Sequence, residues 1–398
     1  MKSTVVDKYL ARYAEPEASS IPSAPGQWDH VVCIPACAEA DSLSATLACL
    51  ARARGAERAL VVTVVNARAS APDAVHLSNA ETLEQLRASC GTTSAPMALG
   101  QLDRMGGLVV DRTGEGHWLP PDQGVGLARK IAGDIALRLI HTGCVQSDWI
   151  RCTDADVQVA ADYFESLAAP ISGASAAISP FTHVPEGDEV QQQAMRIYDA
   201  YLQSYVDGLA SAGSPYAFHT IGSLISVQAQ AYAAVRGIPR RQAGEDFYLL
   251  NKLAKVGRVC SLDGGMVRIR GRLSDRVPFG TGAALLEIRS ALEAGRPTRS
   301  YDPRVFDGLR WWLVALRQFV ECKDIEALKE QVRAAPSPLG EALAETLARL
   351  GAFDAAQQAS EQVSGDTLHR RLMEWNDAFR TLKLVHGLRD AGIVTDAD

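Results

Sequence analysis

The sequence contains few cysteines, and no two of them have the spacing of a metal or redox site. Eight cysteines are scattered over 398 residues without a Cys-x-x-Cys pair. This argues against a disulfide framework or a cysteine-based zinc site, and it is typical of buried thiols in a reducing compartment. Uncharged apolar runs fall short of the ~18 residues of a membrane span, and Lys2, Asp7 and Lys8 interrupt the apolar stretch that a signal peptide needs. We therefore expect a cytoplasmic protein without a transmembrane segment.

An excess of positive charge is also missing. The chain has 40 Lys and Arg residues against 47 Asp and Glu residues, a formal net charge of −7. This balance argues against nucleic acid or an anionic membrane surface as a partner. Hydrophobic residues make up 47% and charged residues 22% of the sequence, which is typical of a folded globular chain and excludes a disordered or collagen-like one.

Several well-known nucleotide-binding and catalytic motifs are absent. No glycine lies between Gly26 and Gly55, so the first predicted strand lacks the Gly-x-Gly-x-x-Gly turn of a dinucleotide-binding fold. The sequence also has no Gly-Lys-Ser/Thr phosphate loop, no Gly-x-Ser-x-Gly elbow and no His-Glu-x-x-His helix. These absences exclude the commonest dehydrogenase, P-loop, serine hydrolase and zinc protease classes.

Buried strands alternate with helices in the first part of the chain. The β-branched runs 30–35 and 60–66 and the apolar segment ending at 149–153 predict buried strands, while 42–54 and 127–141 have helical spacing. This alternation predicts an α/β fold with an open, twisted, mostly parallel sheet flanked by helices. Ligands bind such sheets at the carboxyl ends of the strands.

The later part of the chain changes character. Strands and helices are mixed after residue 173, and from about residue 283 the composition shifts to Ala, Leu, Glu and Arg with helical spacing. The segment 90–126 is variable and rich in glycine. We therefore expect a leader over 1–28, two parts of the sheet domain over 29–170 and 171–283, and a mainly helical region over 284–398.

The sequence Thr153-Asp154-Ala155-Asp156 follows a predicted strand. Two carboxylates one residue apart can place one side chain on a divalent cation and the other on a ribose, a metal-bound water or a neighbouring cation. Such a metal could stabilise the charge that develops on a departing diphosphate. Asp-x-Asp also occurs in turns and helix caps, but its place at a strand end favours the functional interpretation.

Two further motifs each have a functional and a structural explanation. Glu245 and Asp246 open a predicted helix, where carboxylates cap the helix dipole or where Asp246 could act as a general base. Arg268, Arg270 and Arg272 alternate along a predicted strand, which suits phosphate binding or a charged edge strand. Both explanations remain open for each motif.

Taken in order, these features resemble a GT-A fold nucleotide-sugar glycosyltransferase and are most similar to glycosyltransferase family 2. The resemblance runs from about Val31 to Gly282. It is carried by the following motifs: Ile34-Pro35 with Glu39, Gly126-Leu127-Ala128-Arg129-Lys130, Asp154-Ala155-Asp156, Gly222-Ser223 and Glu245-Asp246. It implies that 29–170 is the nucleotide-sugar-binding half and 171–283 the acceptor-binding half of a GT-A domain.

The resemblance also implies roles for single residues. Asp246 would be the catalytic base of an inverting transfer, Glu245 its neighbour at the acceptor, and Asp156 the ligand of Mn²⁺ or Mg²⁺. The residues expected at the nucleotide sugar are Pro35, Glu39, Asn66, Arg129, Lys130 and Asp154. Those expected at the acceptor or a phosphate are His219, Gly222, Ser223, Arg268, Arg270, Arg272 and Arg276.

The sequence departs from the family pattern at two points. Ala38 stands where the family usually has Asn, and no histidine lies between Asp246 and His369 to supply a later metal ligand. Asp263, His219 or the arginine-rich stretch 268–276 could compensate for that ligand.

The leading hypothesis is transfer of a sugar from a nucleoside diphosphate donor to a hydroxyl of a small or lipid-linked acceptor, dependent on a divalent metal. The alternatives are a retaining transferase on the same fold and a sugar-nucleotide-binding protein that has lost catalysis. The C-terminal helices are expected to form an acceptor lid or a homo-oligomer interface.

Overall fold

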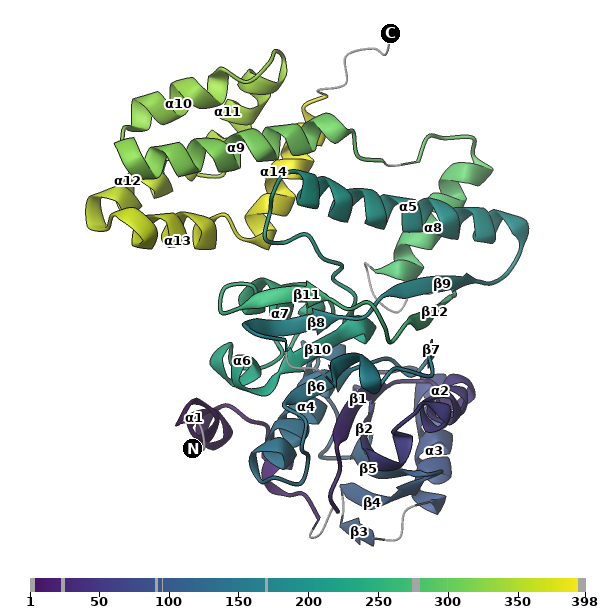
Figure 1. Cartoon of the computed structure of the whole chain (residues 1–398). Helices are drawn as coiled ribbons and strands as arrows, with labels where there is room; N and C mark the ends of the chain where they lie inside the picture. The colour runs from purple at the N-terminus through teal and green to yellow at the C-terminus, as the bar shows by residue number, and fades with distance from the viewer. Residues whose placement is uncertain are drawn as a thin grey trace. The chain divides into compact units, whose positions relative to one another are not determined.

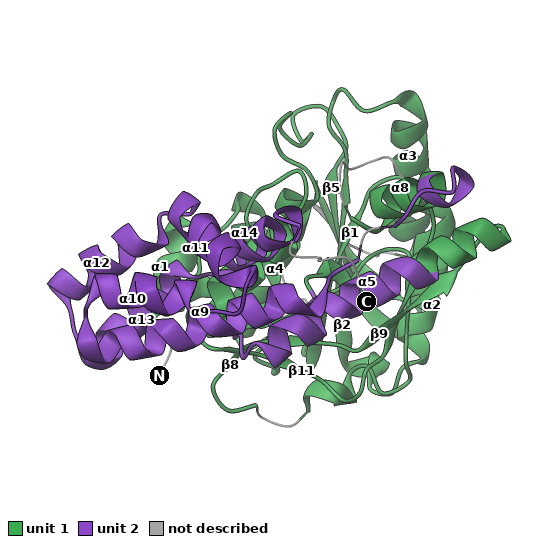
Figure 2. Ribbon diagram, turned by 90° about the horizontal axis from the view of Figure 1, so that it is seen from above, with its two compact units in different colours: residues 1–195, 220–290 green, residues 196–219, 291–398 purple. Residues whose placement is uncertain are grey.

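The computed structural model describes residues 4–22, 26–89, 92–94, 96–168, 171–273, 280–298 and 300–392. The chain divides into two compact units, coloured separately in Figure 2: Met1–Met195 with Thr220–Ser290, and Arg196–His219 with Ala291–Asp398. Among the described residues, no helix has the length and apolar character needed to cross a membrane.

A nine-stranded sheet forms the centre of the first unit (Figure 1). From one edge to the other its strands are β11 (Arg258–Ser261), β8 (Ala174–Ile178), β10 (Ile225–Gln228), β6 (Trp149–Cys152), β1 (His30–Ala36), β2 (Ala59–Asn66), β5 (Met105–Arg112), β4 (Met97–Leu102) and β3 (Thr92–Ser94). The central strands β6, β1, β2 and β5 are parallel, and β10, β8 and β4, β3 add antiparallel pairs on the two sides. Every residue of β2 is buried, as expected for a strand covered on both faces.

Helices cover both faces of this sheet, with α4 on one side of β1 and β2 and with α2 and α3 on the other (Figure 1). The helices of the first unit are α1 (Thr4–Arg12), η1 (Pro16–Ser19), α2 (Ala40–Arg52), η2 (Ala56–Arg58), α3 (Asp73–Ala88), α4 (Val125–His141), η3 (Glu165–Leu167), η4 (Gly222–Leu224), α6 (Ala229–Ala234) and α7 (Glu245–Leu253). A small second sheet has the order β7 (Val157–Val159), β12 (Val267–Gly271), β9 (Phe181–Pro185). The predicted α/β sheet flanked by helices is therefore confirmed.

The strand β5 lies in the segment that the sequence analysis described only as variable and rich in glycine. Close packing leaves no room for a side chain at its two glycines. A Cβ on Gly106 would lie 2.4 Å from Cζ2 of Trp28, and a Cβ on Gly107 would lie 2.4 Å from Cγ of Leu102. Glycine weakens the usual strand signal because it offers no side chain to pack. Here it allows two bulky side chains to cover the sheet.

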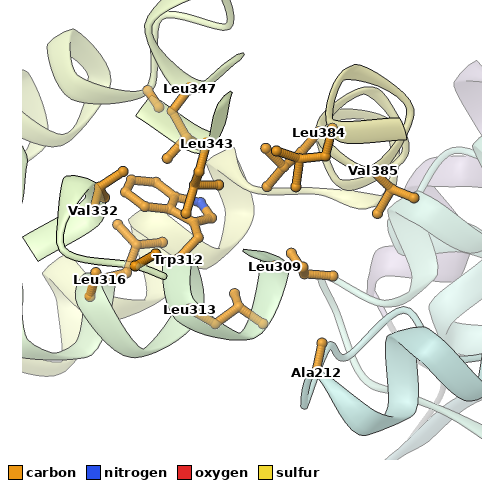
Figure 3. Close-up of a cluster of buried hydrophobic side chains, with 14 of the residues drawn as sticks. Ala212, Leu309, Trp312, Leu313, Leu316, Val332, Leu343, Leu347, Leu384 and Val385 are labelled. Carbon is orange, nitrogen blue, oxygen red and sulfur yellow. The ribbon is translucent and has the colours of Figure 1, made fainter. Parts of the chain in front are cut away.

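The second unit is helical, which confirms the predicted helical C-terminal region. Its helices are α9 (Pro303–Cys322), α10 (Ile325–Arg333), α11 (Leu339–Arg349), α12 (Ala352–Gln362), α13 (Gly365–Trp375) and α14 (Ala378–Asp390). Two more helices, α5 (Glu189–Ser211) and α8 (Thr281–Glu293), each begin in the first unit and end in the second. Figure 3 shows the indole of Trp312 among Val332, Leu316 and Leu343. Trp312 is fully buried and donates from Nε1 to Asn376 Oδ1 at 3.1 Å, so this tryptophan is a core residue.

Candidate active site

A cavity of about 640 Å³ opens in the first unit at the carboxyl ends of β1, β2 and β6. Pro35 lies on β1, Asn66 ends β2, and the loop Asp154-Ala155-Asp156 follows β6. The other residues that line it are Cys37, Glu39, Ala67, Arg68, Ser70, Ala71, Pro72, Val75, Leu119, Gly124, Val125, Arg129, Gln242 and Arg272. The sheet edge that the sequence predicted for a ligand therefore contains a cavity large enough for a nucleotide-sized molecule.

Buried amides hold the loop that follows β1. Asn66 donates from Nδ2 to the backbone oxygen of Ala36 at 3.0 Å, and Asn79 donates from Nδ2 to the backbone oxygen of Asn66 at 2.9 Å. Asn79 Oδ1 accepts from the backbone nitrogen of Ala38 at 2.8 Å. Ala38 has a φ of 55°, a left-handed conformation that is more costly for alanine than for asparagine. Asn66 and Asn79 thus fix the floor of the cavity beside Glu39.

The loop between β6 and β7 is also fixed by a buried side chain. Thr46 Oγ1 lies 2.9 Å from the backbone oxygens of both Ala155 and Val157. The backbone nitrogen of Thr153 donates to the backbone oxygen of Cys33 at 3.0 Å. These contacts tie the loop to α2 and β1, so the carboxylates of Asp154 and Asp156 have defined positions in the cavity wall.

A buried arginine joins the cavity to the beginning of α7. Arg129, on α4 and 6% exposed, donates from Nη2 to Asp154 Oδ1, and its Nε lies 3.0 Å from Glu245 Oε1. A Cβ on Gly222 would lie 2.6 Å from Arg129 Nη2, so the glycine leaves room for the guanidinium. One cation therefore connects a carboxylate at the cavity with a carboxylate beside Asp246.

Asp246 is the second residue of α7, and its carboxylate accepts from the backbone nitrogen of Phe247 at 2.7 Å. Burial of the carboxyl group, followed by the neighbouring charge of Glu245, raises the pKa of Asp246 to about 7. The pKa of Glu245 is also raised, mainly by its own burial and against the opposing charge of Arg129. A carboxyl group with a pKa near neutrality can accept and release a proton under ordinary conditions.

A second arginine bridges two carboxylates inside the cavity. Arg272 follows the last residue of β12, and its Nη2 lies 2.8 Å from Asp156 Oδ2 and also donates to Glu39 Oε1. Burial lowers and the two carboxylates raise the pKa of Arg272, with a net upward shift. The guanidinium therefore remains charged where it faces the cavity.

The residues present do not fit a divalent metal at Asp156. Hard cations such as Mn²⁺ and Mg²⁺ are bound by several oxygen ligands, but Asp156 Oδ2 and Glu39 Oε1 already contact the Arg272 guanidinium. Within the described part of the chain, no group of three His, Cys, Asp or Glu side chains is arranged to hold a metal ion.

The other residues expected at the site lie in several places. Lys130 lies on a different face of α4 from Arg129, because neighbours on a helix point about 100° apart: its Nζ contacts Tyr9 Oη at 2.6 Å and Asp134 Oδ2 at 2.8 Å. Lys130 is therefore part of a buried polar cluster and does not line the cavity. His219 belongs to the second unit, and the cavity is built from the first unit alone.

Of the arginines in and after β12 and the residues near Gly222, some line the cavity and others do not. Arg268 and Arg270 share the exposed face of β12, as the alternation predicts, and Arg270 pairs with Glu186 at 2.5 Å. Neither arginine lines the cavity, whereas Arg272 does. Ser223 is buried beside Gly222 in η4. Arg276 lies outside the described residues.

Two residues of the cavity wall that hold neighbouring loops, Arg68 and Gln242, were not predicted from the sequence. Arg68 donates from Nε to the backbone oxygen of Gln123 at 2.9 Å, and Gln242 donates from Nε2 to the backbone oxygen of Pro121 at 3.0 Å. Both lie in loops that approach the cavity from distant parts of the sequence, and no local pattern distinguishes them. The position of Arg68 two residues after the end of β2 was the only available signal.

No protein-family model matches the chain, and no curated protein matches it. Among solved structures, TarS from S. aureus in complex with UDP-GlcNAc is similar at 11% identity and a TM-score of 0.41, over 89% of this chain and 92% of that one. The mannosyltransferase PcManGT from Pyrobaculum calidifontis, with GDP-Man and Mn²⁺, is similar at 18% identity and 0.37, over 92% and 93%. Glucosyl-3-phosphoglycerate synthase from Mycobacterium tuberculosis, with Mn²⁺, UDP and glucosyl-3-phosphoglycerate, is similar at 15% identity and 0.32, over 74% and 85%.

These similar structures belong to the class that the sequence motifs resemble. With TM-scores below 0.5 they add no argument about function, which is therefore drawn from the site itself.

Proposed function

We propose that this protein is a glycosyltransferase that moves a sugar from a nucleoside diphosphate donor to a hydroxyl acceptor with inversion at the anomeric carbon. The cavity at the ends of β1, β2 and β6 takes the donor. Asn66 and Pro35 form its floor, and Glu39 and Asp154 provide acceptors for ribose hydroxyls. The volume of about 640 Å³ is adequate for such a ligand, since small-molecule pockets span ~300–1,000 Å³.

Asp246 is the general base of this proposal. It takes the proton of the acceptor hydroxyl while the acceptor oxygen forms a bond to the anomeric carbon. The bond between that carbon and the diphosphate oxygen breaks on the opposite side, and the electron pair leaves with the diphosphate. A base works best when its pKa lies near the working pH, and the pKa of about 7 for Asp246 meets this condition.

The observation that carries the proposal is the pair of buried ionic contacts that connect the donor cavity with the helix start that holds the general base. Arg129 contacts Asp154 in the cavity wall and Glu245 beside Asp246. A structural helix cap at α7 would not require a buried arginine shared with the cavity, whereas a catalytic base must be held at a fixed position relative to the donor. Arg129 provides that connection.

The test replaces the base while leaving the cavity unchanged. Asp246→Asn is expected to lower turnover by about 10²–10⁴-fold, the usual contribution of a general base, and to leave donor binding intact. Turnover is measured as release of nucleoside diphosphate from UDP-GlcNAc and GDP-mannose, the donors bound in two of the similar structures, and binding is measured by calorimetry. Asp263→Asn, at an exposed position, is the matched control and is expected to behave as the wild type.

Near-wild-type turnover in Asp246→Asn would contradict the assignment of the base. The configuration of the product, read by NMR, tests inversion separately: a product with the donor's configuration would favour the retaining transferase. Donor binding without turnover in the wild type, over a broad set of hydroxyl acceptors, would favour a sugar-nucleotide-binding protein.

A further inference from the structure

The cavity contains a cation at the position where the sequence motif suggested a metal. Arg272 contacts Asp156 and Glu39 through the same nitrogen, Nη2. These carboxylates come from different elements, the loop after β6 and the loop after β1. Arg272 therefore connects two loops of the cavity wall through one carboxylate from each.

The charged side chains that line the cavity balance one another. Among the described residues, three are acidic and three are basic: Glu39, Asp154 and Asp156 against Arg68, Arg129 and Arg272. A diphosphate entering this cavity therefore encounters arginines that already neutralise the carboxylates. A divalent metal that used Asp156 Oδ2 or Glu39 Oε1 as a ligand would have to displace Arg272 first.

We propose that the guanidinium of Arg272, rather than a divalent metal ion, is the cation that binds the donor's diphosphate. This inference rests on the proposed function. A guanidinium has five N–H donors in a planar fork that matches phosphate oxygens. Because both carboxylate contacts of Arg272 use Nη2, Nε and Nη1 can bind phosphate oxygens while Asp156 holds the side chain in place. Arg272 then stabilises the negative charge that grows on the departing diphosphate.

The other arginines of the first unit are less suited to this role. Arg129 is buried and tied to Asp154 and Glu245. Arg68 uses Nε to hold the backbone oxygen of Gln123. Arg270 pairs with Glu186 on the exposed face of β12. The side chain of Arg272 is 29% exposed and lines the cavity, so it is accessible to a ligand.

The experiment measures binding of UDP and GDP by calorimetry, once with chelator and once with Mn²⁺. The wild type is expected to bind its preferred nucleotide with affinities that agree within about 2-fold in the two conditions. Arg272→Ala is expected to lose at least about 10-fold in affinity with chelator, since a charge-assisted hydrogen bond is removed. Mn²⁺ should restore part of this loss, because Arg272 no longer occupies Asp156 Oδ2 and Glu39 Oε1. Arg268→Ala removes an exposed arginine from the same strand and is expected to change nothing.

Arg272→Lys keeps the charge and tests the planar fork: it is expected to bind more tightly than Arg272→Ala and more weakly than the wild type. Unfolding curves of each variant establish that the fold is kept. Binding that requires Mn²⁺ in the wild type, with no loss in Arg272→Ala, would overturn this inference and leave the proposed function standing. Absence of nucleotide binding by the wild type in both conditions would overturn both.

Discussion

The two units of the molecule bury different kinds of side chain. Among the described residues, the first unit buries eight charged side chains: Glu15, Glu17, Glu39, Arg129, Lys130, Asp134, Arg151 and Glu245. The second unit buries one, Asp377, which caps α14 by accepting from the backbone nitrogen of Arg380 at 3.2 Å. A buried charge lowers stability unless it is paired, so the first unit keeps a costly arrangement that the second unit avoids.

Part of this polar interior is structural. Lys130, Asp134 and Tyr9 hold α1 against α4, and these three residues do not line the cavity. The remainder, around Arg129 and Arg272, faces the cavity or connects it to Asp246. Among the described residues, the core of the second unit is by contrast mainly apolar and centres on Trp312, Leu343 and Leu384. Under the proposed function, the chemistry belongs to the first unit.

The largest expected effect follows from removing the buried cation. Arg129→Met leaves Asp154 and Glu245 without their partner and is expected to lower the free energy of unfolding by about 3–5 kcal/mol. Arg54→Met removes an arginine from the Arg54–Glu165 pair, in which both side chains are more than half exposed, and is the matched control, with a loss below about 1 kcal/mol. Urea unfolding measures both. Equal losses of unfolding free energy in Arg129→Met and Arg54→Met would contradict the claim that the buried ion pairs of the first unit depend on their arginine.

The apolar core is tested at Trp312, which is fully buried. Trp312→Ala creates a cavity and is expected to cost about 3–5 kcal/mol in the free energy of unfolding. Val314→Ala, at a position 43% exposed on the same helix, should cost less than about 0.5 kcal/mol. Because Trp312 belongs to the second unit and the described residues that line the cavity belong to the first, Trp312→Ala is expected to leave nucleotide binding unchanged. Loss of nucleotide binding in this variant would contradict the assignment of nucleotide binding to the first unit.

A smaller effect is expected from filling the space beside Arg129. Gly222→Ala places a Cβ 2.6 Å from Arg129 Nη2 unless the guanidinium moves, and overpacking of this kind costs about 1–3 kcal/mol. Turnover should fall further than donor affinity, since Arg129 holds the elements around the base. Gly114→Ala, where an added Cβ meets nothing within 4 Å, is the control. Wild-type turnover in Gly222→Ala would mean that the position of Arg129 is not critical.

The sequence predicted most of the fold because buried parallel strands and amphipathic helices leave strong local patterns. β1, β2, β6 and the C-terminal helices follow from such patterns. β5 did not, since Gly106 and Gly107 are explained only by contacts with Trp28 and Leu102. Local alternation also predicted that Arg268, Arg270 and Arg272 share one strand face, and Arg268 and Arg270 do so on β12.

The site was predicted less completely. The Asp154 and Asp156 motif and the Glu245-Asp246 pair were identified by their places at element ends, and the structure places Asp154 and Glu245 on one arginine. The sequence did not distinguish Arg129, which lines the cavity, from Lys130, which does not, because the distinction depends on which face of α4 is turned toward the cavity. The contact of Arg272 with Glu39 joins residues 233 positions apart, which no local pattern records.

The pH dependence of turnover tests the role of Asp246 most directly. Transfer needs the ionised carboxylate, and the pKa of about 7 means that the carboxyl group is protonated at lower pH. Release of nucleoside diphosphate at saturating donor and acceptor is therefore expected to be constant above about pH 8 and to fall about tenfold per pH unit below the midpoint. That midpoint belongs to the Glu245–Asp246 pair, because their charges interact. Turnover that stays constant from about pH 8 down to pH 5, with the protein still folded, would contradict the account.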